Sequence, residues 1–217
     1  MSNRNITIPK YSLSEELISS ISHGVGALLG IAALVLCVIR GAFNGSAMQV
    51  VSCSIYGGTL VVLYTMSCLY HALKVNLAKK VFRIIDHCSI YLLIAGTYTP
   101  YTLVSLKGAL GWTMFGIVWG CAIIGIVLNA IDLKKFKVIS MILYLVMGWC
   151  VIFCFPQVKA ALGAGTWWLL VGGIAYTLGA VLYGIGKKVK YMHSVFHFFV
   201  LAGSILHFFS IMFYVLV

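Results

Sequence analysis

The chain has 217 residues, of which 62% are hydrophobic and only 9% are charged, and its mean hydropathy is +1.07. A soluble domain of this length could not bury so much apolar surface, because soluble proteins are typically about 45–50% apolar and about 25% charged. The composition therefore predicts an integral membrane protein and excludes an ordinary soluble domain.

Seven apolar stretches follow one another along the chain, and most have the ~20 residues that an α-helix needs to cross about 30 Å of hydrocarbon. Strand-like alternation is absent, which excludes a membrane β-barrel. We therefore predict an all-α integral membrane protein, a seven-transmembrane-helix bundle in which residues 17–217 form a single membrane domain. The expected helices are Leu17–Ile39, Met48–His71, Ile84–Leu106, Leu110–Ile131, Val138–Phe155, Thr166–Gly186 and Met192–Val217.

Residues 1–16 precede the first span and are predicted to form a short cytoplasmic tail. They contain the capping-box pattern Ser12-Leu-Ser-Glu15, which is typical of a helix N-terminus. The apolar run that follows is too long for the hydrophobic region of a signal peptide and has no small-residue cleavage site, so we expect a retained first helix. Glu15 and Glu16 fall at the membrane interface and are expected to need no special role.

The count of seven depends on dividing residues 84–131 at Lys107-Gly108. A lysine in the middle of this long apolar run favours two helices. Pro100 falls inside the third span and should kink it, because proline lacks the amide donor of a regular helix.

Basic residues are distributed unevenly between the two ends of the predicted bundle. Arg40, Lys107 and Lys159 are alone on one side. Because basic residues are enriched in cytoplasmic loops, the other side is predicted to be cytoplasmic, with the N-terminus inside and the C-terminus outside. This topology explains the net charge of +11 and leaves no basic domain for nucleic acid. The cytoplasmic set is Arg4, Lys10, Lys74, Lys79, Lys80, Arg83, Lys134, Lys135, Lys137, Lys187, Lys188 and Lys190.

Ionisable residues within a membrane span are costly, so each is a candidate functional residue. Several polar side chains fall at one depth, about a helical turn inside the cytoplasmic surface, because a helix rises 1.5 Å per residue. Ser67 and His71 share a helix face because they are four residues apart, and so do His193 and His197. Asp86 is the only acid at that depth.

Three imidazoles from two helices suit a zinc ion. Neutral histidine is a favoured zinc ligand, and three protein ligands with an open fourth position are typical of catalytic zinc. His71, His193 and His197 are the candidate ligands, Asp86 is the candidate base that holds and deprotonates a water, and Ser67 could donate a hydrogen bond to Asp86 or to a substrate carbonyl. An HxxxH pair alone is a weak motif, so hydrogen-bonded core histidines are an alternative, as is a structural zinc.

The other histidines are weaker candidates for the site. His207 lies ten residues, or about 15 Å, beyond His197 and is interpreted as a packing residue. His87 points about 100° away from Asp86 and is expected to pack or to support a ligand. His23 lies at a similar depth in the first helix and could line a cavity or orient a ligand.

The motifs resemble those of the hemolysin III group of bacterial membrane proteins, which belong with the progestin and adiponectin receptors and, more distantly, with the alkaline ceramidases. The resemblance covers nearly the whole chain. It implies seven helices with a cytoplasmic N-terminus, a zinc ion held by the three histidines, and a water held by the aspartate with the serine beside it. It rests on Ser67-Cys-Leu-Tyr-His71, Asp86, His193-Ser-Val-Phe-His197, Glu15-Glu16…His23-Gly, Ala95-Gly-Thr-Tyr-Thr-Pro100-Tyr and Leu201-Ala-Gly-Ser…His207-Phe.

Three functions are compatible with this pattern. The first is a zinc-dependent membrane hydrolase acting on an amide or ester of a lipid, with Asp86 as general base. The second is a non-enzymatic membrane regulator or sensor with a structural zinc, and the third, a cytolysin, rests on the family name alone. We expect a multi-pass protein of the cell membrane, with membrane lipids as partners, a lipid substrate in the bundle interior and no nucleic acid; the oligomeric state is left open.

Overall fold

The computed structural model describes residues 8–43, 45–106, 108–186 and 188–217, and every regular element in them is helical, as predicted. Two of the short elements, η1 and η3, are π-helical, and η2 is a 3-10 helix. The elements are α1 (Leu13–Phe43), α2 (Ala47–Ala72), α3 (Leu77–Pro100), η1 (Tyr101–Leu106), α4 (Gly108–Asp132), α5 (Lys137–Trp149), η2 (Cys150–Cys154), α6 (Phe155–Leu162), α7 (Gly165–Ile185), α8 (Met192–Ser210) and η3 (Ile211–Val215).

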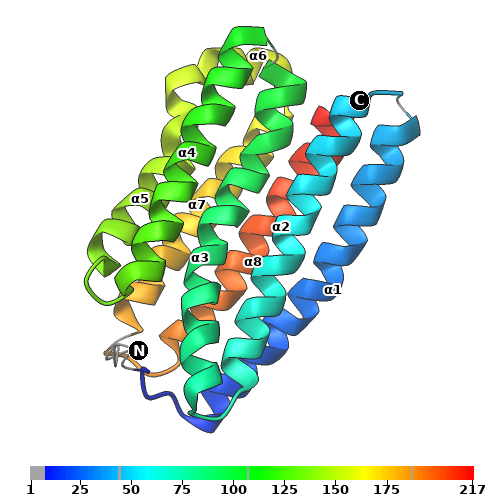
Figure 1. Cartoon of the computed structure of the whole chain (residues 1–217). Helices are drawn as coiled ribbons and strands as arrows, with labels where there is room; N and C mark the ends of the chain where they lie inside the picture. The colour runs from blue at the N-terminus through cyan, green and yellow to red at the C-terminus, as the bar shows by residue number, and fades with distance from the viewer. Residues whose placement is uncertain (1–7, 44, 107, 187) are drawn as a thin grey trace.

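The long helices run side by side as one bundle (Figure 1). Packing largely follows chain order, since α1 packs on α2, α2 on α3, α3 on α4 and α7 on α8. Contacts between α8 and α1 bring the first and last long helices together. α1 begins at one end of the bundle, and the last helical segment stops at the opposite end (Figure 1).

Six segments of the described chain are long and apolar enough to cross a membrane: α1, α2, α4, residues 137–162, α7 and residues 192–215. α3 is long enough but less apolar, because Arg83, Asp86 and His87 lie in its first half. Figure 1 shows α3 running the length of the bundle between α2 and α4. The fold is therefore a multi-pass helical membrane bundle in which one helix is unusually polar at one end.

α1 begins at Leu13, earlier than predicted, because the capping box forms as the sequence indicated. Ser12 N donates to Glu15 Oε2 at 2.9 Å, and Glu15 N donates to Ser12 Oγ at 3.4 Å. Glu15 and Glu16, which were placed in the predicted tail of residues 1–16, therefore already belong to the helix. Both acidic side chains consequently have fixed positions on a helix face.

α3 begins at Leu77, so the predicted start of the third span at Ile84 was wrong. The Asn76 side chain caps the helix by accepting a hydrogen bond from Lys79 N at 2.9 Å. This cap extends the helix over a segment that the sequence suggested was a loop. Lys79 and Arg83 consequently project from a helix that packs inside the bundle.

The predicted kink at Pro100 coincides with a change of helix type. The α-helical pattern of α3 ends at Pro100, and η1 continues the segment to Leu106 as a π-helix. α4 then begins at Gly108, whose φ of 56° lies in the left-handed region that favours glycine. The chain therefore divides here as predicted, although Lys107 itself lies outside the described residues.

The fifth predicted span, Val138–Phe155, is not one α-helix. α5 stops at Trp149, η2 follows as a 3-10 helix, and α6 extends the segment to Leu162. Pro156 lies in the first turn of α6, where its missing amide hydrogen leaves no helical hydrogen bond unmade. The prediction of a uniform helix ending at Phe155 was wrong, because the segment changes helix type before the proline.

α1 and α2 pack closely against each other. A Cβ on Gly26 would lie 2.5 Å from the Tyr64 ring, and a Cβ on Gly57 would lie 2.6 Å from Leu34 Cα. Both positions therefore need glycine to let the two helices approach. The buried Tyr64 hydroxyl also donates to Ser204 Oγ at 2.6 Å, which links α2 to α8.

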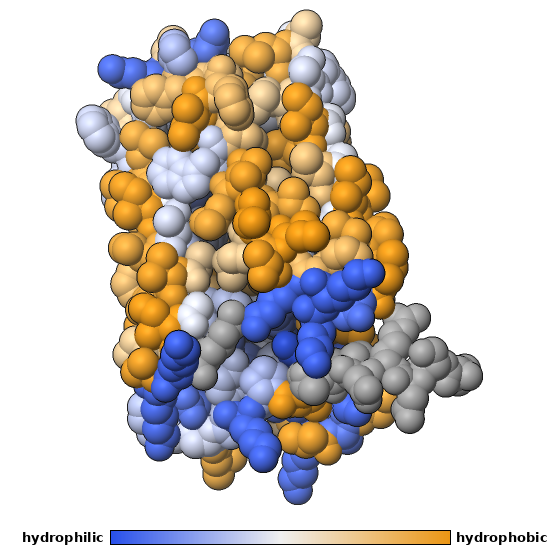
Figure 2. All heavy atoms as spheres, turned by 90° about the vertical axis from the view of Figure 1, so that its left-hand side faces the viewer, coloured by the Kyte–Doolittle hydropathy of each residue, from blue (hydrophilic) through white to orange (hydrophobic). Residues whose placement is uncertain are grey.

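The surface has an apolar middle and a polar end (Figure 2). On the face shown, hydrophilic side chains gather at the end where α1 begins, and hydrophobic side chains dominate the middle. Many large apolar side chains are exposed, among them Phe43 at 85% and Phe153 at 86%. Apolar exposure of this extent fits a lipid environment, because there it is not in contact with water.

Candidate metal centre

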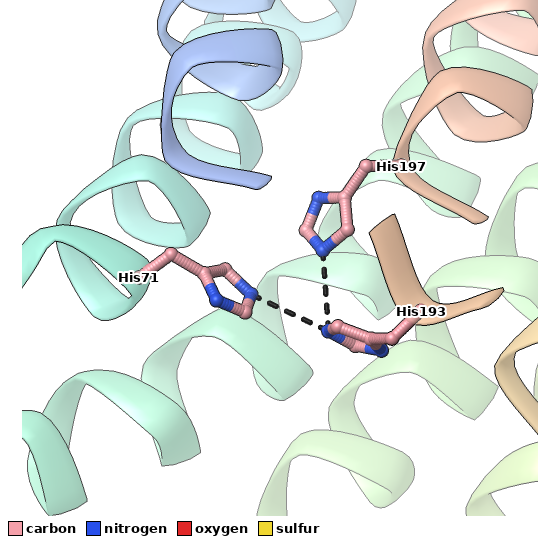
Figure 3. Close-up of side chains that lie close together, drawn as sticks. All are labelled: His71, His193 and His197. Carbon is pink, nitrogen blue, oxygen red and sulfur yellow. Dashed lines mark hydrogen bonds between the residues drawn. The ribbon is translucent and has the colours of Figure 1, made fainter. Parts of the chain in front are cut away.

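Three histidines come together near the end of the bundle at which α1 begins. His71 lies in the last turn of α2, and His193 and His197 lie in the first two turns of α8. One ring nitrogen of each lies within 4.8 Å of the other two, and all three residues are buried. Figure 3 shows the rings converging. Within the described parts of the chain, no other group of three or more His, Cys, Asp or Glu could hold a metal ion.

The atoms that face one another are the Nε2 nitrogens. His71 Nε2 lies 3.4 Å from His193 Nε2, and His193 Nε2 lies 3.3 Å from His197 Nε2 (Figure 3). Two nitrogens bound at about 2.05 Å to a tetrahedral zinc ion would be about 3.3–3.4 Å apart. These separations also exceed the most common length of an N–H hydrogen bond, about 2.9–3.0 Å. Two of the three separations therefore match those around a tetrahedral metal ion, and the third pair lies within 4.8 Å.

The turn before α8 brings two of these histidines into position. His193 and His197 are four residues apart and so share a helix face. α8 follows Tyr191, whose φ of 66° reverses the chain after α7. A Cβ on Gly186 would lie 2.7 Å from His193 N, so the glycine lets the start of α8 lie against the end of α7.

Two further residues surround His71. Glu16 Oε2 accepts a hydrogen bond from His71 Nδ1 at 2.6 Å. Lys79 Nζ donates to Glu16 Oε1 at 2.6 Å and to Leu73 O at 2.9 Å, and its side chain is only 2% exposed. The expectation that Glu16 needs no special role is therefore wrong, and sequence reasoning placed Lys79 in a loop. With the hydrogen on Nδ1, His71 presents the lone pair of Nε2 to the centre.

Asp86 and Ser67 lie beside the cluster, in the wall of a cavity of about 190 Å³ that also reaches His193 and His197. The Ser67 hydroxyl lies beside the Asp86 carboxylate, where α2 faces α3. Neither residue belongs to the group of possible metal ligands. Asp86 can therefore lie beside a bound metal ion without being one of its ligands.

The remaining histidines lie at the edge of the cluster or away from it. The His23 ring centroid lies 4.0 Å from that of His197, and His23 lines the same cavity. His87 donates from Nδ1 to a backbone carbonyl one turn earlier in α3, at 2.9 Å. His207 stacks on Tyr176 with ring centroids 5.4 Å apart. All three lie outside the possible ligand group of the described residues.

The segment before α1 covers one side of the cluster. Tyr11 stacks on His193, with ring centroids 4.5 Å apart and rings 11° from parallel. Burial raises the pKa of the Tyr11 phenol above its ordinary value, so the phenol stays neutral at physiological pH. Glu15 holds the segment against α8, because its Oε1 accepts a hydrogen bond from Tyr191 N at 2.8 Å. The cluster is thus shielded on this side and faces the cavity on another.

The apolar bundle and the buried histidine cluster together define a multi-pass helical membrane protein with a possible metal site. The family model described as "Haemolysin-III related" matches residues 11–208, a range that includes His71, His193 and His197. The chain therefore belongs to this family, as its motifs predicted, and it is a multi-pass protein of the cell membrane.

Three relatives illustrate the range of the family. The chain is 41% identical to "Hemolysin-3" of Bacillus cereus over 205 aligned residues. The aligned region makes up 94% of this chain and 93% of that protein. It is 44% identical over 205 residues to "Hemolysin-3 homolog" of Bacillus subtilis (strain 168), with coverage of 94% and 96%. A more distant relative is the "Monocyte to macrophage differentiation factor" of Homo sapiens, 26% identical over 192 residues, with coverage of 85% and 79%.

Proposed function

We propose that this protein is a zinc-dependent membrane hydrolase that cleaves an amide or ester bond of a lipid. The observation that carries the proposal is the convergence of three buried histidine nitrogens beside Asp86, two pairs of which have the spacing of a tetrahedral zinc site. His71, His193 and His197 would hold the metal, and three histidine ligands leave the fourth position open for chemistry. When bound there, zinc would polarise the substrate carbonyl and lower the pKa of water towards about 7.

Asp86 would act as the general base. It would take a proton from the water that attacks the carbonyl carbon and return it to the nitrogen or oxygen that leaves as the bond breaks. Ser67, beside the carboxylate, would donate a hydrogen bond to it and so restrict its orientation in the cavity wall. Neither role requires Asp86 or Ser67 to bind the metal ion directly.

The cavity supports a lipid as the substrate. Beyond its polar end the wall is largely apolar, with Leu93, Ile94 and Leu169 among its residues. Its volume of about 190 Å³ is below the roughly 300–1,000 Å³ of ordinary ligand pockets, so it suits a slender acyl chain better than a bulky ligand. The cleaved bond would lie at the polar end and the acyl chain in the apolar part.

We further propose seven membrane spans, with α3 and η1 forming the third, the N-terminus in the cytoplasm and the C-terminus outside. The opposite positions of the start of α1 and the end of the last helical segment support an odd number of crossings (Figure 1). Basic residues concentrated at the end where α1 begins support the orientation. A reporter fused after Val217 should be active only outside the cytoplasm, and cytoplasmic activity would contradict this topology.

A second candidate function is a non-enzymatic membrane regulator or sensor with a structural zinc. The Tyr11 ring favours it, because it stacks on His193 and shields the cluster on one side. A fully closed site would need a fourth ligand, and His23, whose ring lies against that of His197, would be the nearest candidate. Cytolysis is suggested only by the names of relatives.

Asp86→Asn separates the two candidates. The variant keeps the side-chain shape but removes the base, so lipid-amide hydrolysis should fall by about 10²–10⁴-fold. Zinc should stay bound through the three histidines, with affinity reduced by at most about 10–100-fold. Zinc content and turnover should be measured together on the purified wild type and variant. Turnover as fast as that of wild type would exclude Asp86 as the base, and a wild type inactive on a broad lipid panel would favour the regulator.

A further inference from the structure

The Glu16–Lys79 ion pair joins three helices around a single candidate ligand. Glu16 lies on α1, His71 on α2 and Lys79 on α3, and the two contacts to the Glu16 carboxylate are both 2.6 Å long. We infer that Glu16 is a positioning residue that sets the zinc affinity of the centre through His71, and that Lys79 stabilises the Glu16 carboxylate by pairing with it. The inference rests on the proposed function, because it assigns Glu16 a role toward the proposed metal.

The carboxylate of Glu16 acts on the ligand nitrogen through the imidazole ring. By accepting the Nδ1 hydrogen of His71, it selects the tautomer whose free lone pair is on Nε2, the atom that faces the other histidines. The same hydrogen bond fixes the rotation of the ring and makes Nε2 more basic. By contrast, His197 Nδ1 has no hydrogen-bond partner among the described residues, whereas the Nδ1 of His71 is supported by the Glu16 carboxylate.

Lys79 balances the charge of that carboxylate. Its ammonium group is buried, contacts Glu16 and Leu73 O, and lies 5.2 Å from the centroid of the Tyr70 ring. A carboxylate largely removed from water and without this partner would destabilise the fold, because a buried charge needs a counter-charge or hydrogen bonds. Lys79 therefore acts mainly on stability, whereas Glu16 acts on both stability and the metal.

This division of roles makes the inference testable with three variants: Glu16→Gln, Lys79→Met and the double variant. Methionine keeps the approximate length of lysine and can pack on the Tyr70 ring. Zinc affinity is measured by competition with a chelator of known affinity, and unfolding temperature is measured separately on the metal-free protein in detergent.

We expect Glu16→Gln to lower zinc affinity by about 10–100-fold, because the amide is a weaker acceptor for His71. Lys79→Met should keep the wild-type affinity but lower the unfolding temperature of the metal-free protein. The double variant should recover unfolding temperature relative to Lys79→Met, because both charges are gone, yet bind zinc as weakly as Glu16→Gln. If Lys79→Met does not fold, the zinc affinities of Glu16→Gln and the double variant, each compared with the wild type, still test the role of Glu16.

Wild-type affinity in the double variant would overturn the inference, as would affinities that merely follow the unfolding temperatures. Glu15→Gln and Lys80→Met are matched controls, because Glu15 contacts Ser12 and Tyr191 instead of a histidine. Both controls should bind zinc like the wild type. A wild-type protein that binds no zinc would overturn the proposed function itself, whereas tight wild-type binding that Glu16→Gln leaves unchanged would overturn only the role of Glu16.

Discussion

His197 and His207 lie on the same helix, about 15 Å apart along its axis, and line the same cavity. Both residues are buried, and the Nδ1 atom of each has no hydrogen-bond partner among the described residues. The difference lies on the other side of each ring. His197 Nε2 is 3.3 Å from His193 Nε2, whereas His207 Nε2 faces Gly172, where an added Cβ would lie 2.9 Å away. A buried histidine thus becomes a candidate ligand through what its second nitrogen faces.

The surroundings of the two histidines follow from different packing. His207 stacks on Tyr176 and lies near the Tyr101 ring, so it fills space between helices. His197 lies where α8 meets α1 and α2, close to His23 and His71. Replacing His197 should therefore lower metal affinity, whereas replacing His207 should lower stability.

The largest effect should come from His197→Ala, which removes one proposed ligand. Zinc binding in small peptides contributes about 10–16 kcal/mol, so one of four coordination positions contributes roughly 3 kcal/mol, or about 100-fold in affinity. Zinc competition measurements on purified protein test this. His207→Phe is the matched control on the same helix and should leave the affinity unchanged. Equal losses in both variants would remove the distinction between the two histidines.

A smaller effect should come from Gly172→Ala, which disturbs the surroundings of His207 and leaves those of His197 intact. The added Cβ would lie 2.8 Å from His207 Cδ2, so the ring or α7 must shift. Overpacking of this kind costs about 1–3 kcal/mol of stability, which thermal unfolding in detergent would detect. Zinc affinity should not change. Gly184→Ala, in open space on the same helix, should unfold like the wild type, and a Gly172→Ala variant that weakens zinc binding would connect the two regions.

The sequence by itself determined the membrane class, most helix positions and the group of candidate ligands. Apolar length alone reveals a helix that crosses a membrane, and the Ser12–Glu15 capping box was visible because its partners are three residues apart. His193 and His197 could be paired for the same reason, since helix geometry fixes side chains four residues apart. Their depth relative to the basic loops then pointed to His71 and Asp86.

Only the tertiary structure showed which atoms meet across helices. Glu16 contacts His71 and Lys79, which are 55 and 63 residues away along the chain, and no local pattern encodes such pairings. The asparagine cap that extends α3 over Lys79 was also missed, because a short polar segment after an apolar span reads as a loop. Helix periodicity places residues on a face, but the rotation and separation of neighbouring helices decide which faces meet. Those quantities depend on close packing between helices, such as the contact of Gly26 with Tyr64.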